Sequence, residues 1–302
     1  MSNTAWPALP LADWEPTYKT LHRWAQMLGK LRIRMSAPIN HWWHSTLHFQ
    51  ARGLTTTPMP IGDARQLEIT LDFVDHQLRL QTSDGETRSL ALEPRSVASF
   101  YTTLFAELRS LGVSTFIWPM PVEIPHPVRF DHDHENASYE PEQVGRMWTI
   151  LRSVHDVFAR SRSEFVGKCS PVHFFWGAFD LALTRFSGRR NPNPPSDPIM
   201  REGYSHELIS HGFWFGGDWP NGARVEQPAF YAYAVPQPEG FATAKVLPAA
   251  ARYDPTFSEF LLPYDAIREA ADPAAELLAF MRSTYEAGAE LARWDRVNLE
   301  RD

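Results

Sequence analysis

Three histidines and two adjacent tryptophans lie within the segment PINHWWHSTLHFQARG, residues 38–53. A histidine side chain titrates near neutral pH, so it can donate or accept a proton during a reaction. His44 is one candidate catalytic residue, and His173, from the second aromatic segment PVHFFWGAFDLALTR (residues 171–185), is the other. An arginine can hold an anionic group, and an aromatic ring can stack on a flat one. The candidate substrate-binding residues are therefore Asn40, Trp42, Arg52, Phe175 and Arg185.

Both aromatic segments are predicted to form β-strands, whose side chains alternate between two faces. One face of the first strand would carry polar or amphipathic residues but no Lys or Glu, the residues typical of a freely solvated face. We expect this face to line an internal cavity. The alternative is a sheet face covered by a helix or loop, with its polar groups hydrogen-bonded internally. The residues of this face are Asn40, Trp42, His44, Thr46, His48, Gln50 and Arg52.

One carboxylate of the second segment would lie in apolar surroundings. Asp180 shares its predicted face with Phe174, Trp176 and Ala178. A carboxylate in such a place is destabilising unless it is paired. We expect a structural partner, either an arginine or a backbone donor; the alternative is a carboxyl group with a perturbed pKa beside a binding site.

Two histidine-containing motifs raise the question of a metal site. The run DHDHE (Asp131–Glu135) offers two histidines and three carboxylates, but acidic surface loops of this kind usually bind no ion tightly, so no metal is predicted there. In SHELISH, His206 and His211 are five residues apart, whereas the zinc-protease motif needs four. Phosphate-loop, dinucleotide and nucleophile-elbow motifs are absent, so the cofactor stays unknown. The histidines that a metal- or haem-dependent enzyme would use are His41, His44 and His206.

Composition excludes several classes of protein. The 302 residues include 29 basic and 36 acidic side chains, and the net charge of −7 gives no attraction to nucleic acids or anionic membranes. Cys169 is the only cysteine, so no disulfide can form within the chain. The N-terminus lacks the pattern of a signal peptide, and the longest uncharged aromatic run, residues 169–179, is too short to span a membrane. We expect a soluble cytoplasmic protein with no nucleic-acid or membrane partner.

Periodicity predicts the elements that must position these residues. Helical patterns cover residues 14–31, with Asp13 able to cap the first turn, and residues 96–111, 141–165 and 272–293. Besides the two aromatic segments, strands are predicted at residues 66–74, 76–82, 87–92, 114–124, 207–215, 229–235 and 259–264. The proline-rich residues 119–141 are predicted to form a loop.

The elements follow the same order twice: helix, aromatic strand, further strands, helix. This order predicts an α+β fold of two related halves, residues 1–130 and 131–302, with mainly antiparallel sheet and flanking helices. The halves could form one fused globular unit. If an ancient duplication produced them, the two aromatic strands should lie near each other. One constant spacing relates three pairs of residues: Pro38 with Pro171, Trp43 with Trp176, and Arg52 with Arg185.

Several long strings are distinctive enough to suggest a family. They include NHWWHSTL, IWPMPVEIP, KCSPVHFFWGAFDLALTRFSGRR, YSHELIS and FYAYAVPQPEGF. From Trp6 to Trp294 the chain resembles a bacterial family known as domain of unknown function 5996. The resemblance implies a cytoplasmic bacterial protein formed by a single family unit, and it implies no activity, cofactor or catalytic residue.

Two functional hypotheses follow from the residues. The first is an enzyme acting on a small organic substrate, anionic or aromatic, with His44 or His173 as the acid or base. The second is a non-catalytic protein that binds a planar small molecule with the same side chains. A site role predicts that replacing either histidine leaves the thermal midpoint nearly unchanged while abolishing binding or turnover.

Overall fold

The structure is a computed structural model that describes residues 5–219 and 222–301. The elements of the first half are α1 (Leu11–Met35), η1 (Asn40–Ser45), β1 (His48–Gln50), β2 (Gly53–Thr55), β3 (Met59–Pro60), β4 (Gln66–Asp72), β5 (Gln77–Thr82), β6 (Thr87–Ala91), α2 (Val97–Ser110) and η2 (Phe130–His132). Those of the second half are α3 (Pro141–Ser163), β7 (His173–Phe175), β8 (Asp180–Arg190), α4 (Pro198–Gly203), β9 (His206–Trp214), β10 (Gly217–Asp218), β11 (Arg224–Val225), β12 (Ala229–Val235), η3 (Phe241–Thr243), β13 (Arg252–Asp254), β14 (Glu259–Pro263), α5 (Tyr264–Arg268), α6 (Pro273–Leu291) and α7 (Arg296–Leu299).

Each half contains one six-stranded antiparallel sheet. The first has the order β1-β2-β4-β5-β6, with β3 beside β4, and the second has the order β13-β14-β12-β9-β8-β7. β10 and β11 form a separate pair. With helices flanking these sheets, the α+β fold and the mainly antiparallel pairing are confirmed.

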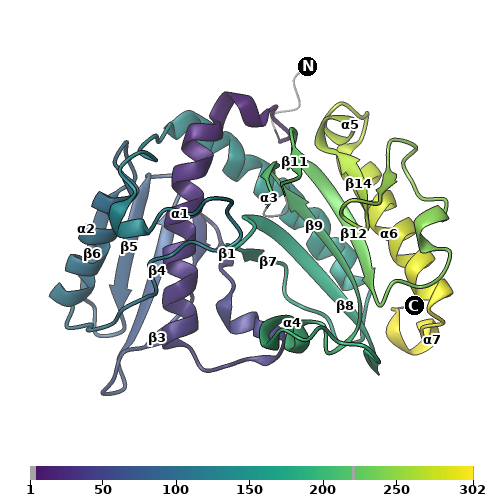
Figure 1. The fold of residues 1–302 in the computed structure, drawn as a ribbon, viewed down its shortest axis with the longest axis horizontal. Helices are drawn as coiled ribbons and strands as arrows, with labels where there is room; N and C mark the ends of the chain where they lie inside the picture. The colour runs from purple at the N-terminus through teal and green to yellow at the C-terminus, as the bar shows by residue number, and fades with distance from the viewer. Residues whose placement is uncertain (1–4, 220–221, 302) are drawn as a thin grey trace.

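The two sheets meet at the aromatic segments. Leu47 and Phe174 exchange two backbone hydrogen bonds, of 2.9 and 2.8 Å, which connect the edge of the first sheet to β7. The expectation that the two aromatic segments lie near each other is therefore confirmed. Helix α1 runs along the middle of the molecule, with one sheet on either side of it (Figure 1).

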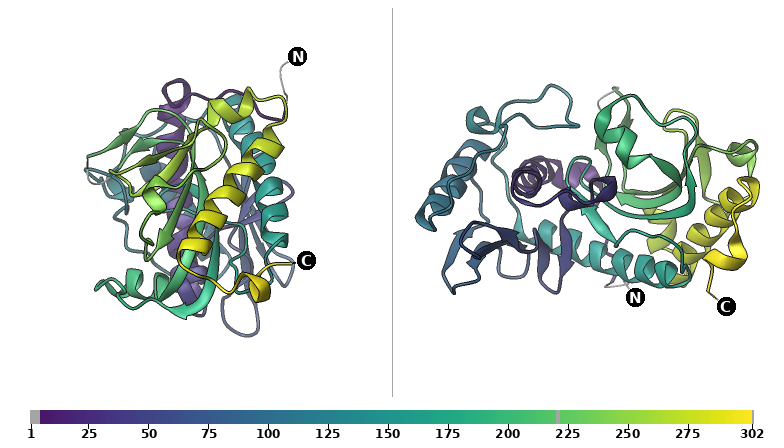
Figure 2. Two further views of the ribbon diagram at one scale, coloured as in Figure 1. Left: turned by 90° about the vertical axis from the view of Figure 1, so that its right-hand side faces the viewer. Right: turned by 90° about the horizontal axis from the view of Figure 1, so that it is seen from below.

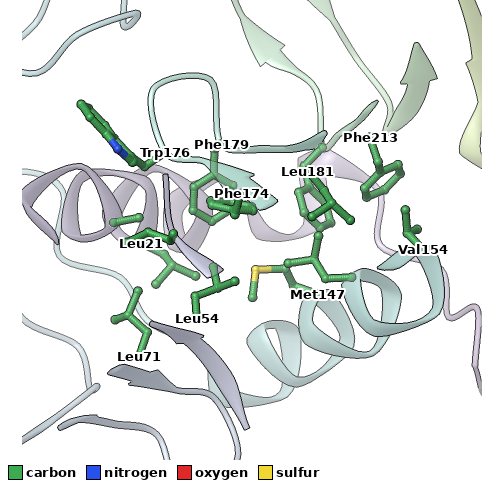
Figure 3. Packing of buried hydrophobic residues seen from close by; sticks show 14 of the residues in the cluster. Leu21, Leu54, Leu71, Met147, Val154, Phe174, Trp176, Phe179, Leu181 and Phe213 are labelled. Atoms are coloured by element: carbon green, nitrogen blue, oxygen red, sulfur yellow. The ribbon is translucent and has the colours of Figure 1, made fainter. Parts of the chain in front are cut away.

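The hydrophobic core extends through both halves. Leu21, Trp24 and Leu28 of α1 are fully buried, as the helical periodicity predicted. Helices α3 and α6 cover one face of the second sheet (Figure 2). On that face, Leu181 and Phe213 lie beside Met147 and Val154 of α3 (Figure 3). The chain thus buries a single continuous cluster, and the division at residue 130 stays a prediction.

The predicted strand over residues 38–53 is wrong. Residues Asn40–Ser45 form a 3₁₀ helix in which His41 and Trp42 have φ values of 58° and 61°, so the side chains do not alternate there. Partners far along the chain bind its carbonyl groups: Nε of Arg32 donates to the oxygen of His44 (2.8 Å), and the indole of Trp176 donates to that of Ser45 (2.6 Å). Only the short strand β1 remains of the prediction.

Three smaller predictions also need correction. The second aromatic segment is two strands, β7 and β8, because the chain turns at residues 176–179, where Phe179 has a φ of 60°. Residues 114–124, which contain two prolines, form no strand. Helix α1 begins three residues before Trp14, and its first turn has no side-chain cap, so Asp13 does not have the predicted capping role.

The residue pairs that suggested a duplication occupy unlike positions. Trp43 lies in the 3₁₀ helix before β1, whereas Trp176 lies in the turn after β7. Arg52 is exposed between β1 and β2, whereas Arg185 is buried within β8. This alignment of individual residues does not hold, although both halves follow the order helix, sheet, helix. Common ancestry of the halves stays a prediction.

Candidate active site

The second sheet presents a polar and aromatic face opposite the helices. The register aligns Asp180 with Trp214, and Gly212 with Tyr231, so alternation places these side chains together with Tyr233 and Glu259 on one face. A cavity of about 410 Å³ lies over it. Its lining consists of Ala178, Asp180, Tyr204, Trp214, Trp219, Tyr231, Tyr233, Ala234, Val235, Gln237, Thr256, Phe257, Ser258 and Glu259.

Helix α1 fixes the turn that leads into Asp180. Nε2 of His22 donates to the backbone oxygens of Gly177 (2.8 Å) and Trp176 (3.1 Å). Burial lowers the pKa of His22 to about 4, so the imidazole is neutral at physiological pH and keeps this donor role. The Trp176 indole packs directly against Gly29, where a Cβ atom would stand only 2.0 Å from Nε1. The absence of a side chain at Gly29 allows the turn to approach the helix.

Asp180 is a buried carboxyl group, and no basic side chain among the described residues pairs with it. Its residue is 6% exposed, and Tyr231 donates a hydrogen bond of 2.5 Å to Oδ2. Burial raises the pKa of Asp180 from 3.8 to about 7; the nearby Glu123 raises it further, while the Tyr231 hydroxyl and the residue's own backbone N–H oppose the shift. Its side-chain partner is therefore a tyrosine hydroxyl and not the predicted arginine, while a backbone donor, the other predicted option, is present as the residue's own N–H.

The ring of Tyr231 reaches Asp180 because position 212 is glycine. A Cβ atom at Gly212 would lie 2.0 Å from Cζ of Tyr231. Any side chain at this position would therefore push the ring away from the sheet and move its hydroxyl group relative to Asp180.

A second carboxyl group and further hydroxyl groups complete the polar part of the cavity. Burial raises the pKa of Glu259 to about 8, with smaller contributions from the charges of Asp180 and Asp254. The hydroxyl groups of Tyr204 and Tyr233 lie 3.2 Å apart. Two carboxyl groups that titrate near neutral pH can exchange protons with a bound molecule, and the hydroxyl groups can donate hydrogen bonds to it.

The remaining walls of the cavity are aromatic. The ring centroids of Trp214 and Trp219 are 5.4 Å apart, and those of Trp219 and Phe257 are 6.1 Å apart. The rings of Tyr231 and Tyr233 stack at 6.0 Å. Such walls accept a flat or apolar body and leave its orientation to the few polar groups.

The structure places the two predicted catalytic histidines outside this cavity. His173 is fully buried, with Nδ1 hydrogen-bonded to the Thr46 hydroxyl group (3.0 Å), and burial lowers its pKa to about 3. His44 is 4% exposed, and its Nδ1 accepts a hydrogen bond from the backbone N–H of Ile39 (3.1 Å). Their catalytic roles stay predictions, and the geometry gives both histidines structural contacts.

The predicted substrate-binding residues are dispersed. Asn40 is exposed, and the ring of Trp42 packs 5.2 Å from that of His44. Phe175 lies 4.7 Å from His173. Arg52 pairs with Asp72 (2.8 Å) on the first sheet, whereas Arg185 is buried and donates to the backbone oxygen and the hydroxyl group of Ser161, both at 2.6 Å. The structure does not gather these side chains into one site.

Two of the three histidines considered for a metal lie together. The rings of His41 and His206 are 5.7 Å apart, but Nε2 of His41 accepts a hydrogen bond from Nζ of Lys168 (2.6 Å). His44, the third histidine, is hydrogen-bonded to the backbone of Ile39. In the loop at residues 131–135, Asp131 pairs with Arg129 and Asp133 pairs with Arg23. Within the described ranges, no group of three or more His, Cys, Asp or Glu side chains is placed to hold a metal ion.

Sequence reasoning missed most of the cavity. Tyr231 and Tyr233 alternate with alanines in AFYAYAV, so the pattern predicts that both rings share one face of a strand. The signal for a site was the hydroxyl group that each of these rings carries, because it makes one end of the ring polar. Glu259 begins its strand after a turn, and nothing in its own segment relates it to Asp180.

Burial gives a specific expectation for His173. Replacing it with alanine removes the hydrogen bond to Thr46 and leaves a space beside Trp43 and Phe175, so the free energy of unfolding should fall by about 1–3 kcal/mol. Urea unfolding of the His173→Ala protein measures this loss. An unchanged unfolding free energy would favour the site role that the sequence predicted.

None of the described helices is long and apolar enough to cross a membrane.

Comparison with known proteins assigns the chain to a family. A family described as "Family of unknown function (DUF5996)" matches residues 6–301, which confirms the resemblance seen in the aromatic strings. Neither the search of curated proteins nor that of solved structures found a match. Because the match covers nearly the whole sequence, this chain belongs to the DUF5996 family.

Proposed function

We propose that the chain is a cytoplasmic enzyme that moves a proton to or from a small organic substrate held in the cavity over the second sheet. Asp180 is the proposed general acid or base. The observation that carries the proposal is a buried carboxyl group that opens onto an aromatic-walled cavity and that, within the described part of the chain, receives a side-chain hydrogen bond from Tyr231 alone. Groups of perturbed pKa in a concave site are common at catalytic centres.

The physical chemistry of Asp180 suits this task. A proton-transfer group is most effective when its pKa lies near the working pH, and burial raises the pKa of Asp180 to about 7. The Tyr231 hydroxyl group fixes the carboxyl group in one orientation, so its other oxygen is the one available to a substrate. Glu259, whose pKa burial raises to about 8, is the proposed second group, which would carry the opposite protonation state during a cycle.

A panel of small organic compounds, followed by mass spectrometry of the products, tests the proposal. We expect at least one compound to be converted by the wild-type protein and its turnover to fall by about a hundredfold or more in the Asp180→Asn variant. The Glu226→Gln variant is the matched control, because its carboxylate is exposed and pairs with Arg224 outside the cavity. Equal turnover in the wild-type and Asp180→Asn proteins would contradict the role of Asp180. Binding without conversion would favour a non-catalytic binding protein.

A further inference from the structure

We infer that the molecule bound in this cavity carries a positively charged nitrogen next to an aromatic or apolar body of about one ring. This inference rests on the proposed function, because it names the substrate class of the same cavity. A cationic ligand differs from the anionic substrate that Arg52 and Arg185 led us to expect from the sequence.

The first argument is the balance of charge. Two carboxyl groups, Asp180 and Glu259, line the cavity, and its described lining includes no Lys, Arg or His. A third carboxyl group, that of Glu123, lies against the backbone near the cavity, where a Cβ atom at Gly177 would be 2.2 Å from Oε1. Among the described residues, none of the three has an ion pair with a basic group. Buried carboxylates are costly without a cation, and a bound ammonium group would supply the missing charge.

The second argument is the chemistry of the walls. Six aromatic side chains line the cavity, and the faces of such rings attract a cation electrostatically, most strongly in tryptophan. A cage of aromatic rings combined with carboxylates is the arrangement that recognises ammonium groups. The aromatic residues are Tyr204, Trp214, Trp219, Tyr231, Tyr233 and Phe257.

The third argument concerns the excluded alternatives. An anionic ligand would meet like charges and no basic group in the described lining, so its burial would be unfavourable. The arginines predicted to hold an anion, Arg52 and Arg185, bind Asp72 and Ser161 away from the cavity. A cavity of about 410 Å³ is at the small end of the range of ligand sites, which limits the ligand to a compact molecule.

Ionisation of the two carboxyl groups in the cavity should make the binding of a cation depend on pH. A cation binds the carboxylates and not the carboxylic acids, so its affinity should rise as the pH passes the raised pKa values of Asp180 and Glu259. The other titratable groups that act on these two carboxyls do not include a basic side chain. The titratable groups around the site include Tyr18 and His22 of α1, Glu123, Tyr204, Asp254 of β13, and Tyr231 and Tyr233 of β12. Burial lowers the pKa of His22 to about 4, so its charge does not change across the pH range of the test.

Three probes of similar size and different charge test the inference: phenyltrimethylammonium, the neutral tert-butylbenzene, and benzenesulfonate. The quaternary cation keeps its charge at every pH, so any change of its affinity reports on the protein. By calorimetry we expect it to bind at least about tenfold more tightly at about pH 8.5 than at about pH 5.5. The neutral probe should bind more weakly and without this pH dependence, and the anion should not bind.

Substitutions localise the effect. Asp180→Asn and Glu259→Gln should each weaken binding of the cation at about pH 8.5 by about tenfold, whereas Glu226→Gln should leave it unchanged. If either variant fails to fold, the three probes measured on the wild-type protein still test whether the cavity prefers a cation. Absence of cation binding at the higher pH, or equal binding of the cation and its neutral counterpart, overturns the inference.

The two proposals can fail separately. Binding of the cation with the expected pH dependence, but without turnover of any amine or other compound, contradicts the enzymatic function and supports the ligand class. Turnover of neutral or anionic compounds that Asp180→Asn abolishes, together with no binding of the cation, supports the function and overturns the ligand class.

Discussion

Replacing Trp176 with alanine is expected to lower the free energy of unfolding by about 3–5 kcal/mol. The indole is 7% exposed and packs against Gly29 of α1, so its removal leaves a large space between the helix and the turn after β7. The backbone oxygen of Ser45 also loses its donor at 2.6 Å. One side chain thus connects α1, the 3₁₀ helix and the second sheet. Denaturant unfolding of the variant measures the loss.

Trp118 is the matched control for this substitution. It is 67% exposed, so Trp118→Ala should change the unfolding free energy by no more than about 0.5 kcal/mol. A loss of less than about 1 kcal/mol in Trp176→Ala would show that the contact with Gly29 adds little to stability.

The second large effect is a change in how stability depends on pH. The folded pKa of Asp180, about 7, lies above its ordinary value of 3.8, so the folded protein binds more protons than the unfolded chain between these values. The contribution of Asp180 to wild-type stability should therefore fall as the pH rises through this window, whereas buried histidines of lowered pKa, such as His22 and His173, act in the opposite direction. At about 1.4 kcal/mol for each pKa unit, the contribution of Asp180 falls by about 3 kcal/mol between about pH 5 and about pH 8.

Asparagine at position 180 cannot ionise, yet its side-chain oxygen can still accept the hydrogen bond from Tyr231. We expect the stability of the Asp180→Asn protein to rise relative to that of the wild type over this pH range and to exceed it at about pH 8, because the contributions of the histidines are common to both proteins. Glu259 acts in the same direction, so the variant should keep part of the pH dependence. Glu226→Gln should follow the wild-type curve. Parallel curves for wild type and Asp180→Asn would contradict a raised pKa at this position.

The sequence alone determined the elements whose signals are local. Helix α2 begins where Ser96 caps it by accepting from the N–H of Ser99, and α6 follows Asp272 in the same way. Strand β12 coincides with the alternating run AFYAYAV. Hydrophobic periodicity and capping depend on neighbouring residues, so they can be read without knowledge of the fold.

The sequence was misleading where distant groups satisfy the backbone. Asn40–Ser45 has an aromatic composition typical of a strand, yet donors from Arg32 and Trp176 hold its carbonyl groups in a 3₁₀ helix. The turn that separates β7 from β8 depends in the same way on His22 of α1. Local propensity is weak compared with such tertiary hydrogen bonds, because a buried carbonyl group must find a donor wherever one is placed.

The candidate active site depends more on contacts between distant segments than on local signals. The sequence singled out Asp180 because alternation placed its carboxylate among apolar residues, and this signal comes from neighbouring residues alone. Its neighbours are set by the order β8-β9-β12-β14, which brings Tyr231 and Glu259 onto the same face from strands far apart in the chain. Alternation within one strand fixes which side chains share a face, but the pairing of strands decides which faces meet. The sequence therefore determined the polar and aromatic character of each strand, and only the tertiary structure brought the two carboxyl groups into one cavity, where burial raises their pKa values.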